Sequence, residues 1–159
     1  AIGVALYTVV FYQSRLYADM GLQAIYFVLS LYGWYEWLHG GKDRAELRVS
    51  RTSPLAWAGL LAAGIAASAI LGFTLHRTTD AAVPFLDSAL TSFSLVAQFM
   101  MTRKLLENWI LWLAVDVIYI GMFISRGLNL TAVLYVVFFV LSMMGFAQWR
   151  RSISKEVAE

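Results

Sequence analysis

The fold of this chain is decided by the stretch Glu107–Tyr119, which reads E-N-W-I-L-W-L-A-V-D-V-I-Y. It opens an apolar run that is longer than the apolar stripe of an ordinary surface helix. On a helix with about 100° per residue, Trp109, Trp112, Asp116 and Tyr119 fall within roughly a quarter of the circumference. Three aromatic rings and one carboxylate therefore share one face of a membrane-length helix.

Two interpretations of Asp116 are open. An ionisable side chain at mid-membrane depth is energetically costly, so its presence indicates a functional site with polar surroundings. Alternatively, the tryptophans anchor the helix at an interface and Asp116 pairs with a neighbouring helix. The common face of the aromatics and the acid favours the site.

The composition is that of an all-α, polytopic membrane protein. Of 159 residues, 60% are hydrophobic and 14% are charged, and the mean hydropathy is +0.68. A soluble domain carries about 25% charged residues. The net charge of +2 gives no support to nucleic-acid binding. The chain contains no cysteine, and His39 and His76 lie in predicted loops far from a second metal ligand, so we expect no metal and no cofactor.

Hydropathy predicts five complete membrane-spanning helices and the second half of another. The half helix is Ala1–Tyr12, so we expect the beginning of the protein to be missing from this sequence. Gln13–Met20 is predicted to be a polar loop, Arg126–Leu130 a tight turn and Arg150–Glu159 a polar tail. Ser53-Pro54 has the pattern of a helix start. The complete spans are Gly21–Leu38, Leu55–Leu75, Phe85–Met101, Trp109–Ser125 and Thr131–Trp149.

The charges of the loops predict the orientation in the membrane. Alternating spans place the loops Lys42–Thr52 and Thr102–Asn108 on the same side as the C-terminal tail, opposite the loop His76–Val83. Nine of the twelve Lys and Arg residues lie on that side. Since positively charged loops stay inside the cell, this side and the C-terminus are predicted to be cytoplasmic.

The chain contains a hidden repeat. Tyr7–Trp37 aligns without a gap on Tyr119–Trp149, and ten of 31 positions are identical, including Gly33 with Gly145 and Trp37 with Trp149. Apolar composition alone would give roughly three identities, so the match indicates a repeated unit. Both copies cross the membrane in the same direction, which predicts a parallel repeat about an axis along the membrane normal.

This repeat predicts a 3+1+3 plan of helices in the intact protein, of which this sequence lacks the first helix and half of the second. Two parallel three-helix units need an odd number of crossings between them, so Leu55–Leu75 is the connector. The predicted domains are residues 1–38, the remainder of the first repeat; 39–82, a cytoplasmic loop and the connector; 83–149, the second repeat; and 150–159, the cytoplasmic tail.

Four of the predicted helices carry a polar or aromatic stripe, whereas the connector carries small residues on its surface. One such stripe alone would indicate packing between helices. Four converging stripes favour a substrate site near the middle of the membrane. The candidate substrate-binding residues are Gln23, Tyr26, Thr91, Ser94, Gln98, Trp109, Trp112, Asp116, Tyr119 and Tyr135.

Signatures of an enzyme are absent from the sequence. Gly40-Gly41-Lys42-Asp43 lacks the first glycine and the hydroxyl residue of a phosphate-binding loop. No carboxylate pair, histidine cluster or Ser–His arrangement falls at membrane depth. A membrane enzyme and a structural or assembly protein are therefore remote alternatives, and we expect no catalytic residue.

Three motifs resemble the PnuC family of bacterial vitamin transporters. They are Tyr32-Gly33-Trp34-Tyr35-Glu36-Trp37, Asp87-Ser88, and above all the run from Met101 to Trp112, M-T-R-K-L-L-E-N-W-I-L-W. The resemblance covers essentially the whole chain. It implies an inner-membrane protein with a SWEET-like 3+1+3 fold that forms trimers. It also implies facilitated diffusion of nicotinamide riboside, which a separate cytoplasmic kinase traps by phosphorylation.

The residues agree with that class of substrate. Nicotinamide riboside is a flat pyridinium cation on a ribose, and tryptophan faces hold such a cation by about 0.5–2 kcal/mol per ring. Asp116 can supply the counter-charge, while Gln23, Gln98 and the hydroxyls suit the ribose and the carboxamide. Thiamine, another flat cationic vitamin, would fit the same lining and stays open as an alternative.

Overall fold

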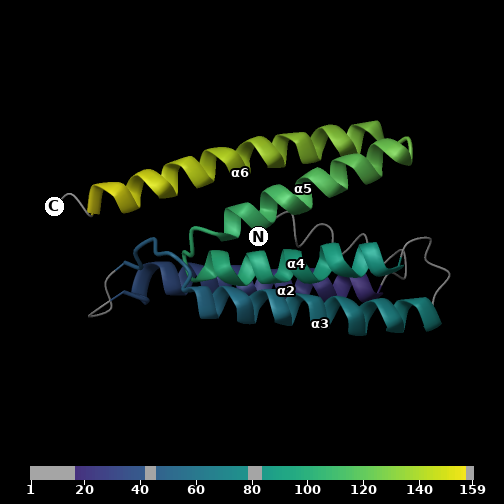
Figure 1. The fold of residues 1–159 in the computed structure, drawn as a ribbon, viewed down its shortest axis with the longest axis horizontal. Coiled ribbons are helices and arrows are strands. Elements are labelled where there is room, and N and C mark those ends of the chain that lie inside the picture. The colour runs from purple at the N-terminus through teal and green to yellow at the C-terminus, as the bar shows by residue number, and fades with distance from the viewer. Residues whose placement is uncertain (1–16, 42–45, 79–83, 157–159) are drawn as a thin grey trace. The chain divides into compact units, whose positions relative to one another are not determined.

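The computed structural model describes residues 17–41, 46–78 and 84–156, with side chains described from residue 25 to residue 154. The predicted half helix Ala1–Tyr12 lies outside these residues. Within them the chain is helical, as its composition predicts, apart from connecting segments and one isolated β-bridge between Ser50 and Leu105. The helices are α2 (Tyr17–His39), α3 (Pro54–Thr78), α4 (Pro84–Thr102), α5 (Asn108–Ser125) and α6 (Asn129–Glu156) (Figure 1).

Each predicted span lies inside one of these helices, but several predicted boundaries were wrong. The start of α2 at Tyr17 falls in a segment predicted to be a loop, and α6 begins at Asn129 and continues through the predicted polar tail to Glu156. Both His39 and His76 are helical instead of lying in loops. Hydropathy marks only the part of a helix that lies in lipid, whereas backbone hydrogen bonding continues into the headgroup region.

Three of the described helices, α3, α5 and α6, are long and apolar enough to cross a membrane. The length of α4 is comparable, but one carboxylate, several hydroxyls and a carboxamide lower its hydropathy. A helix that carries polar side chains through a membrane must turn them toward other protein groups. The polarity of α4 therefore favours a position inside a bundle.

The chain divides into two compact units. One unit consists of the chain up to Arg48, which includes α2, together with Met101–Lys104. The other consists of Val49–Met100 and Leu105–Glu159, which contain α3, α4, α5 and α6.

In the first unit, the C-terminal half of α2 is held by polar contacts to Met101–Lys104. The indole Nε1 of Trp37 donates to the carbonyl oxygen of Met101 at 3.0 Å, and Arg103 forms an ion pair with Glu36 at 3.2 Å. The ammonium group of Lys104 lies 5.1 Å from the centre of the Trp37 ring. The motif Thr-Arg-Lys that marks the family resemblance therefore has a structural role in anchoring α2.

In the second unit, α3 and α4 pack closely because α3 has glycine, which lacks a side chain, at the positions that meet α4. A Cβ atom at Gly64 would lie 2.8 Å from the Phe93 ring, and one at Gly72 would lie 2.6 Å from the Phe85 ring. Both glycines are buried. The small residues of the predicted connector thus receive aromatic side chains from α4, as expected for a close-packing helix.

The core of the second unit lies at the junction of α3, α4 and α5. Its buried members are Ala97, Met100 and Leu111. Partly buried apolar side chains surround them: Trp57, Leu60, Leu61, Phe93, Val96, Leu105 and Trp112.

The helices α5 and α6 run antiparallel and side by side (Figure 1). The turn between them depends on Gly127, whose φ of +72° lies in the left-handed region that favours glycine. Backbone N–H groups of Gly127 and Leu128 donate to the carbonyls of Ile124 and Phe123 at 3.0 Å and 2.9 Å and so close the end of α5. This turn lets Trp109, Asp116 and Tyr119 of α5 meet α6.

We expect Gly64→Leu to destabilise the packing of α3 on α4, since the new side chain would collide with the Phe93 ring. Overpacking of this kind costs about 1–3 kcal/mol. The matched control is Gly59→Leu on the same helix, where a Cβ atom meets nothing within 4 Å. Thermal unfolding in detergent should show a lower midpoint for Gly64→Leu only, and equal midpoints would contradict this packing.

Candidate functional site

The predicted stripe on α5 faces α6 over most of its length. Trp109 is half-buried and packs edge-on against Trp149, with ring centres 5.3 Å apart. A Cβ atom at Gly145 would lie only 2.5 Å from the Trp109 ring, so glycine makes room for the indole. The sequence repeat singled out Gly145 and Trp149, and the structure shows that both contact Trp109.

Asp116 is buried in the middle of this interface. It is 3% exposed, and the hydroxyl of Ser142 on α6 donates to its Oδ2 at 3.4 Å. This distance is long for a hydrogen bond between oxygen atoms. A carboxylate offers about four acceptor positions, so one weak donor leaves most of them unused among the described residues. Asp116 can therefore accept further hydrogen bonds or face a cation.

At the far end of the stripe, Tyr119 joins a cluster of aromatic rings. The ring of Tyr135 on α6 lies 4.6 Å from that of Tyr119 and 5.3 Å from that of Phe123. Phe138 packs edge-on against Tyr135 at 5.6 Å. The candidate residues Tyr119 and Tyr135 are thus brought together, and their tilted aromatic contact holds the end of the α5–α6 interface next to the turn.

The beginning of α5 carries three buried polar atoms that have no hydrogen-bond partner among the described residues. They are Oδ1 of Asn108 and the indole Nε1 atoms of Trp109 and Trp112. Asn108 is fully buried, and its Nδ2 donates to the carbonyl of Leu105 at 2.6 Å. An unpaired buried donor or acceptor costs about 1–3 kcal/mol. Two donors and one acceptor therefore lie within little more than one turn of α5, and a polar ligand would satisfy them.

Asn108 lies in the stretch Glu107–Tyr119 but is not among the residues that the sequence predicts for the site. The signal was present, because a carboxamide at the start of an apolar helix lies beside two tryptophans. Its burial could not be predicted, since the first residue of a helix usually lies in solvent. The core side chains packed on Trp112 show why this end of α5 is enclosed.

Glu107 fixes the start of α5 to the segment that precedes α3. Its Oε2 accepts hydrogen bonds from the backbone N–H of Thr52 at 2.8 Å and from the Thr52 hydroxyl at 2.6 Å. The N–H of Leu106 donates to the carbonyl of Ser50 at 2.9 Å. Charge-assisted hydrogen bonds are short and strong, so this clamp positions the tryptophans that follow. Sequence reasoning did not predict it.

The predicted site residues of α4 have different surroundings. Ser94 is 5% exposed, and Thr91 and Gln98 are half-buried. Within the described part of the chain, none of these three side chains makes a hydrogen bond to the α5 stripe. Their burial agrees with a polar face turned inward.

The remaining candidates belong to α2 in the other unit. Tyr26 is half-buried, and the side chain of Gln23 lies outside the described ones. The structure therefore joins four of the predicted residues along α5 and α6, namely Trp109, Asp116, Tyr119 and Tyr135, whereas Trp112 packs against the core of Ala97, Met100 and Leu111. In the described ranges, no group of three or more His, Cys, Asp or Glu residues is placed to hold a metal ion.

The sequence profile of the nicotinamide mononucleotide transporter family matches residues 1–151. The chain belongs to this family. It is accordingly a multi-pass membrane transporter of a small-molecule vitamin, embedded in a lipid bilayer, and not an enzyme. The resemblance to PnuC proteins seen in the motifs is confirmed.

Individual relatives show the range of the family. The chain is 28% identical to the nicotinamide riboside transporter PnuC of Escherichia coli (strain K12), covering 95% of this chain and 74% of that protein. It is 26% identical to the riboflavin/roseoflavin transporter RibM of Streptomyces davaonensis, covering 87% and 66%. The crystal structure of the vitamin B3 transporter PnuC matches with a TM-score of 0.70 at 26% identity, covering 97% and 70%.

We expect Gly145→Ala to disturb the beginning of the α5–α6 interface, because the added methyl group would occupy the position of the Trp109 ring. The expected loss in the free energy of unfolding is about 1–3 kcal/mol. Gly121→Ala is the control, since a Cβ atom there meets nothing within 4 Å. If both variants unfold at the same temperature, Trp109 does not pack on α6 in this way.

Proposed function

We propose that this protein carries nicotinamide riboside across the bacterial inner membrane by facilitated diffusion. The observation that carries the proposal is the face of α5. On it a buried carboxylate, Asp116, follows two tryptophans whose indole N–H groups have no partner among the described residues. The membership in a transporter family supports the same conclusion.

Each part of the substrate has a matching group on this face. The pyridinium ring can stack on Trp109 or Trp112, and Asp116 can balance its positive charge. The carboxamide oxygen can accept a hydrogen bond from an indole N–H, and the carboxamide N–H can donate to Oδ1 of Asn108. A ligand that satisfies these atoms removes the cost of burying them unpaired.

We infer that the site is completed by the other polar stripes. Thr91, Ser94 and Gln98 on α4, with Gln23 and Tyr26 on α2, would supply groups for the ribose. Tyr119 and Tyr135 would close the aromatic end. The 3+1+3 plan and the four domains expected from the repeat would place these helices around a common axis, and a trimer would be the assembled form.

The transport step is proposed to be passive. The sequence offers neither a phosphate-binding loop nor a cluster of carboxylates for coupling ions, so binding and release at one site would only equilibrate the substrate. A cytoplasmic kinase would then trap it by adding a phosphate. We infer from the positive-inside rule that the C-terminus and nine of the twelve Lys and Arg residues lie in the cytoplasm.

A second candidate is transport of another flat vitamin. The relative RibM is a riboflavin/roseoflavin transporter, so one fold serves chemically different rings. Thiamine is a cation like nicotinamide riboside, whereas riboflavin is uncharged. The carboxylate at Asp116 favours a cation over riboflavin.

The function is tested in liposomes that contain the purified protein. Labelled nicotinamide riboside should equilibrate unchanged across the bilayer without ATP or an ion gradient, and thiamine and riboflavin should not compete at equal concentration. If thiamine or riboflavin is bound and nicotinamide riboside is not, that vitamin is the substrate instead. Recovery of a modified product would favour an enzyme, and uphill accumulation would exclude passive transport.

We expect Trp112→Ala to weaken substrate binding on the order of tenfold to a hundredfold, because the variant loses a stacking face. Calorimetric titration measures the affinity. Trp57→Ala is the control, since Trp57 packs on the same core cluster from α3 and lies outside the stripe. If Trp57→Ala weakens binding equally, the effect comes from lost core packing and Trp112 does not contact the substrate.

We expect Asp116→Asn to weaken binding of the charged vitamin more than that of its neutral, reduced analogue. The substitution keeps the size of the side chain, removes its charge and replaces one acceptor oxygen by an NH2 donor. If Asp116 has a purely structural role with Ser142, both ligands should suffer equally and the unfolding temperature should fall. Ser142→Ala separates these cases, because it removes the partner on α6 and leaves the carboxylate in place.

A further inference from the structure

The outer face of α6, on the side away from α5, is a continuous apolar strip. The residues that meet α5 are Tyr135, Ser142, Gly145 and Trp149. At about 100° per residue, the opposite side carries a row of large side chains that stay exposed. This row consists of Leu130, Val133, Val137, Val140, Leu141 and Met144.

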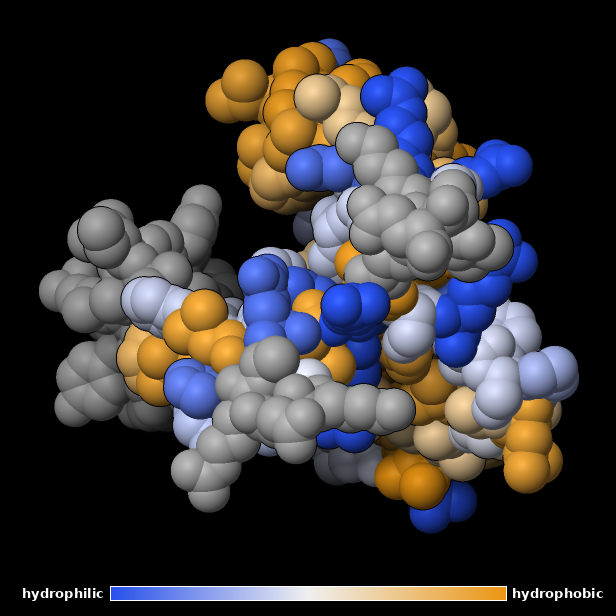
Figure 2. Space-filling model, turned by 90° about the vertical axis from the view of Figure 1, so that its left-hand side faces the viewer, coloured by the Kyte–Doolittle hydropathy of each residue, from blue (hydrophilic) through white to orange (hydrophobic). Residues whose placement is uncertain are grey.

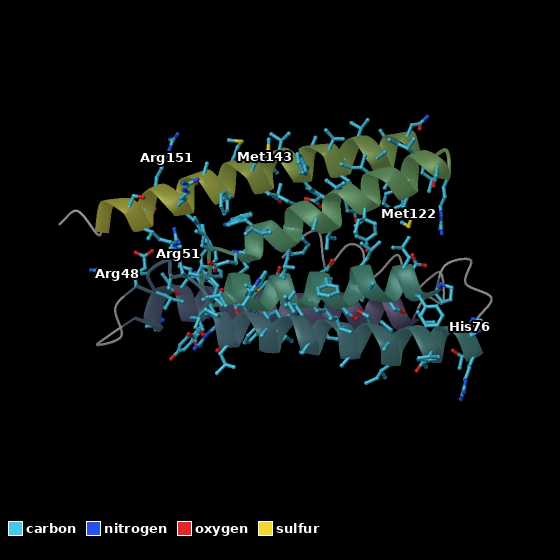
Figure 3. All side chains as sticks on the ribbon, in the orientation of Figure 1. Arg48, Arg51, His76, Met122, Met143 and Arg151 are labelled. Carbon is cyan, nitrogen blue, oxygen red and sulfur yellow. The ribbon has the colours of Figure 1, made fainter. Side chains whose placement is uncertain are left out.

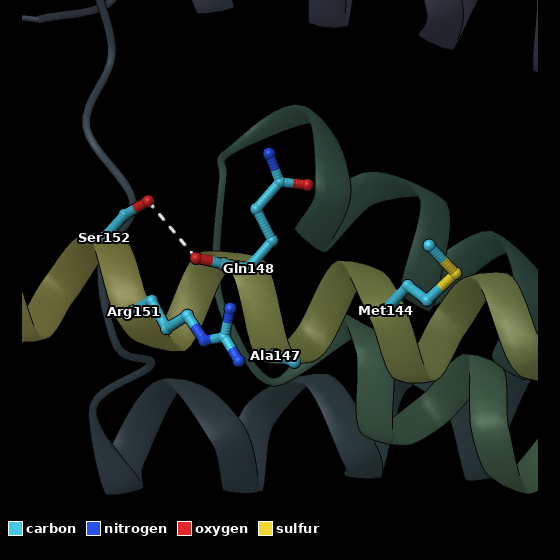
Figure 4. Close-up of a pocket in the computed structure, with 5 residues that line it drawn as sticks. All are labelled: Met144, Ala147, Gln148, Arg151 and Ser152. Carbon is cyan, nitrogen blue, oxygen red and sulfur yellow. Dashed lines mark hydrogen bonds between the residues drawn. The ribbon is translucent and has the colours of Figure 1, made fainter.

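Polar side chains end this strip at the C-terminal end of α6. An open hollow of about 580 Å³ is lined by Met144, Ala147, Gln148, Arg151 and Ser152, which lie on successive turns of α6 (Figure 4). The Arg151 side chain extends along the helix toward Ala147, and the Ser152 hydroxyl donates to the carbonyl of Gln148 at 3.3 Å. The hollow is therefore apolar on one side and cationic on the other.

The depth of this transition matches the edge of a lipid bilayer. The apolar residues of α6 occupy about 20 positions, which is the length that crosses a hydrocarbon core of about 30 Å. The following turns, which contain Arg151, then lie among the lipid headgroups. The change from apolar residues to Arg151 on α6 therefore falls at the boundary between hydrocarbon and headgroups.

No acid whose side chain is described pairs with the cationic side of the hollow. Among the residues whose side chains are described, Arg150 and Arg151 form no ion pair, and the carboxamide of Gln148 makes no hydrogen bond. Arg51 lies toward the same end of the second unit (Figure 3). Seen from this end, α6 at the top shows hydrophilic side chains directly beside hydrophobic ones (Figure 2).

We propose that this hollow binds an anionic phospholipid, with the phosphate at Arg151 and Gln148 and an acyl chain along Met144 and Val140. A phospholipid has the two chemical halves that the face presents, in the same order. A free phosphate would use the cation but leave the apolar strip unused. The placement in the inner leaflet depends on the proposed orientation, in which the anionic cytoplasmic surface attracts each nearby cation.

The test uses the purified protein, delipidated in detergent, with phosphatidylglycerol or phosphatidylcholine of the same acyl chains. Phosphatidylglycerol should be retained in native mass spectra and should raise the unfolding temperature more than phosphatidylcholine does. Arg151→Gln should weaken phosphatidylglycerol binding about fivefold, as expected for one cation near an anionic surface. Arg126→Gln, at the turn between α5 and α6, is the control and should keep the preference.

Other outcomes would overturn the proposal. An equal effect of inorganic phosphate or glycerol phosphate would indicate a soluble anion site. An unchanged lipid preference in Arg151→Gln would remove this face as the lipid site, and a change in oligomeric mass in that variant would indicate an interface with a second copy. If the protein fails to transport the substrate but keeps its lipid preference, the proposed function is wrong and the lipid site stands.

Discussion

A carboxylate inside a membrane-spanning helix is the constraint on which the arrangement of this protein depends. Asp116 is buried, and the only donor that reaches it among the described residues is the Ser142 hydroxyl, through a long hydrogen bond. Lipid offers no hydrogen bonds, so a carboxylate at this depth must face protein or a ligand. The antiparallel pairing of α5 with α6 meets this requirement, and the aromatic contacts on both sides of Asp116 hold the pair in register.

The two interpretations of Asp116 are thus not exclusive. The contact with Ser142 shows that the residue pairs with a neighbouring helix, as the structural interpretation requires. One long hydrogen bond satisfies only part of a carboxylate, which leaves acceptor positions for a cation. In the proposed carrier, the substrate would supply the missing partners of Asp116, and its release would stay possible because the Ser142 contact remains.

Small and polar residues define where the helices of the second unit can approach one another. Gly64 and Gly72 admit phenylalanine rings from α4, and Gly145 admits the indole of Trp109. Helices in lipid gain nothing from hydrophobic burial, so close packing of backbones and rings is a main source of their association. Glu107 adds a polar clamp at the start of α5, which orients the tryptophans that follow.

The sequence alone determined the fold class and the positions of the spans, because the cost of placing polar groups in lipid leaves a strong pattern of hydropathy. The run from Met101 to Trp112 indicated the family. It also placed Trp109, Trp112, Asp116 and Tyr119 on one face, since helical periodicity is a local property. Only the tertiary structure decided which helix that face meets, that Asn108 is buried with an unpaired carboxamide oxygen, and that Glu107 binds Thr52. These contacts join residues far apart in the chain, and no local period encodes them. The start of α2 and both ends of α6 were also known only from the structure. Backbone hydrogen bonds continue beyond the part of a helix that lies in hydrocarbon, and hydropathy marks only that part.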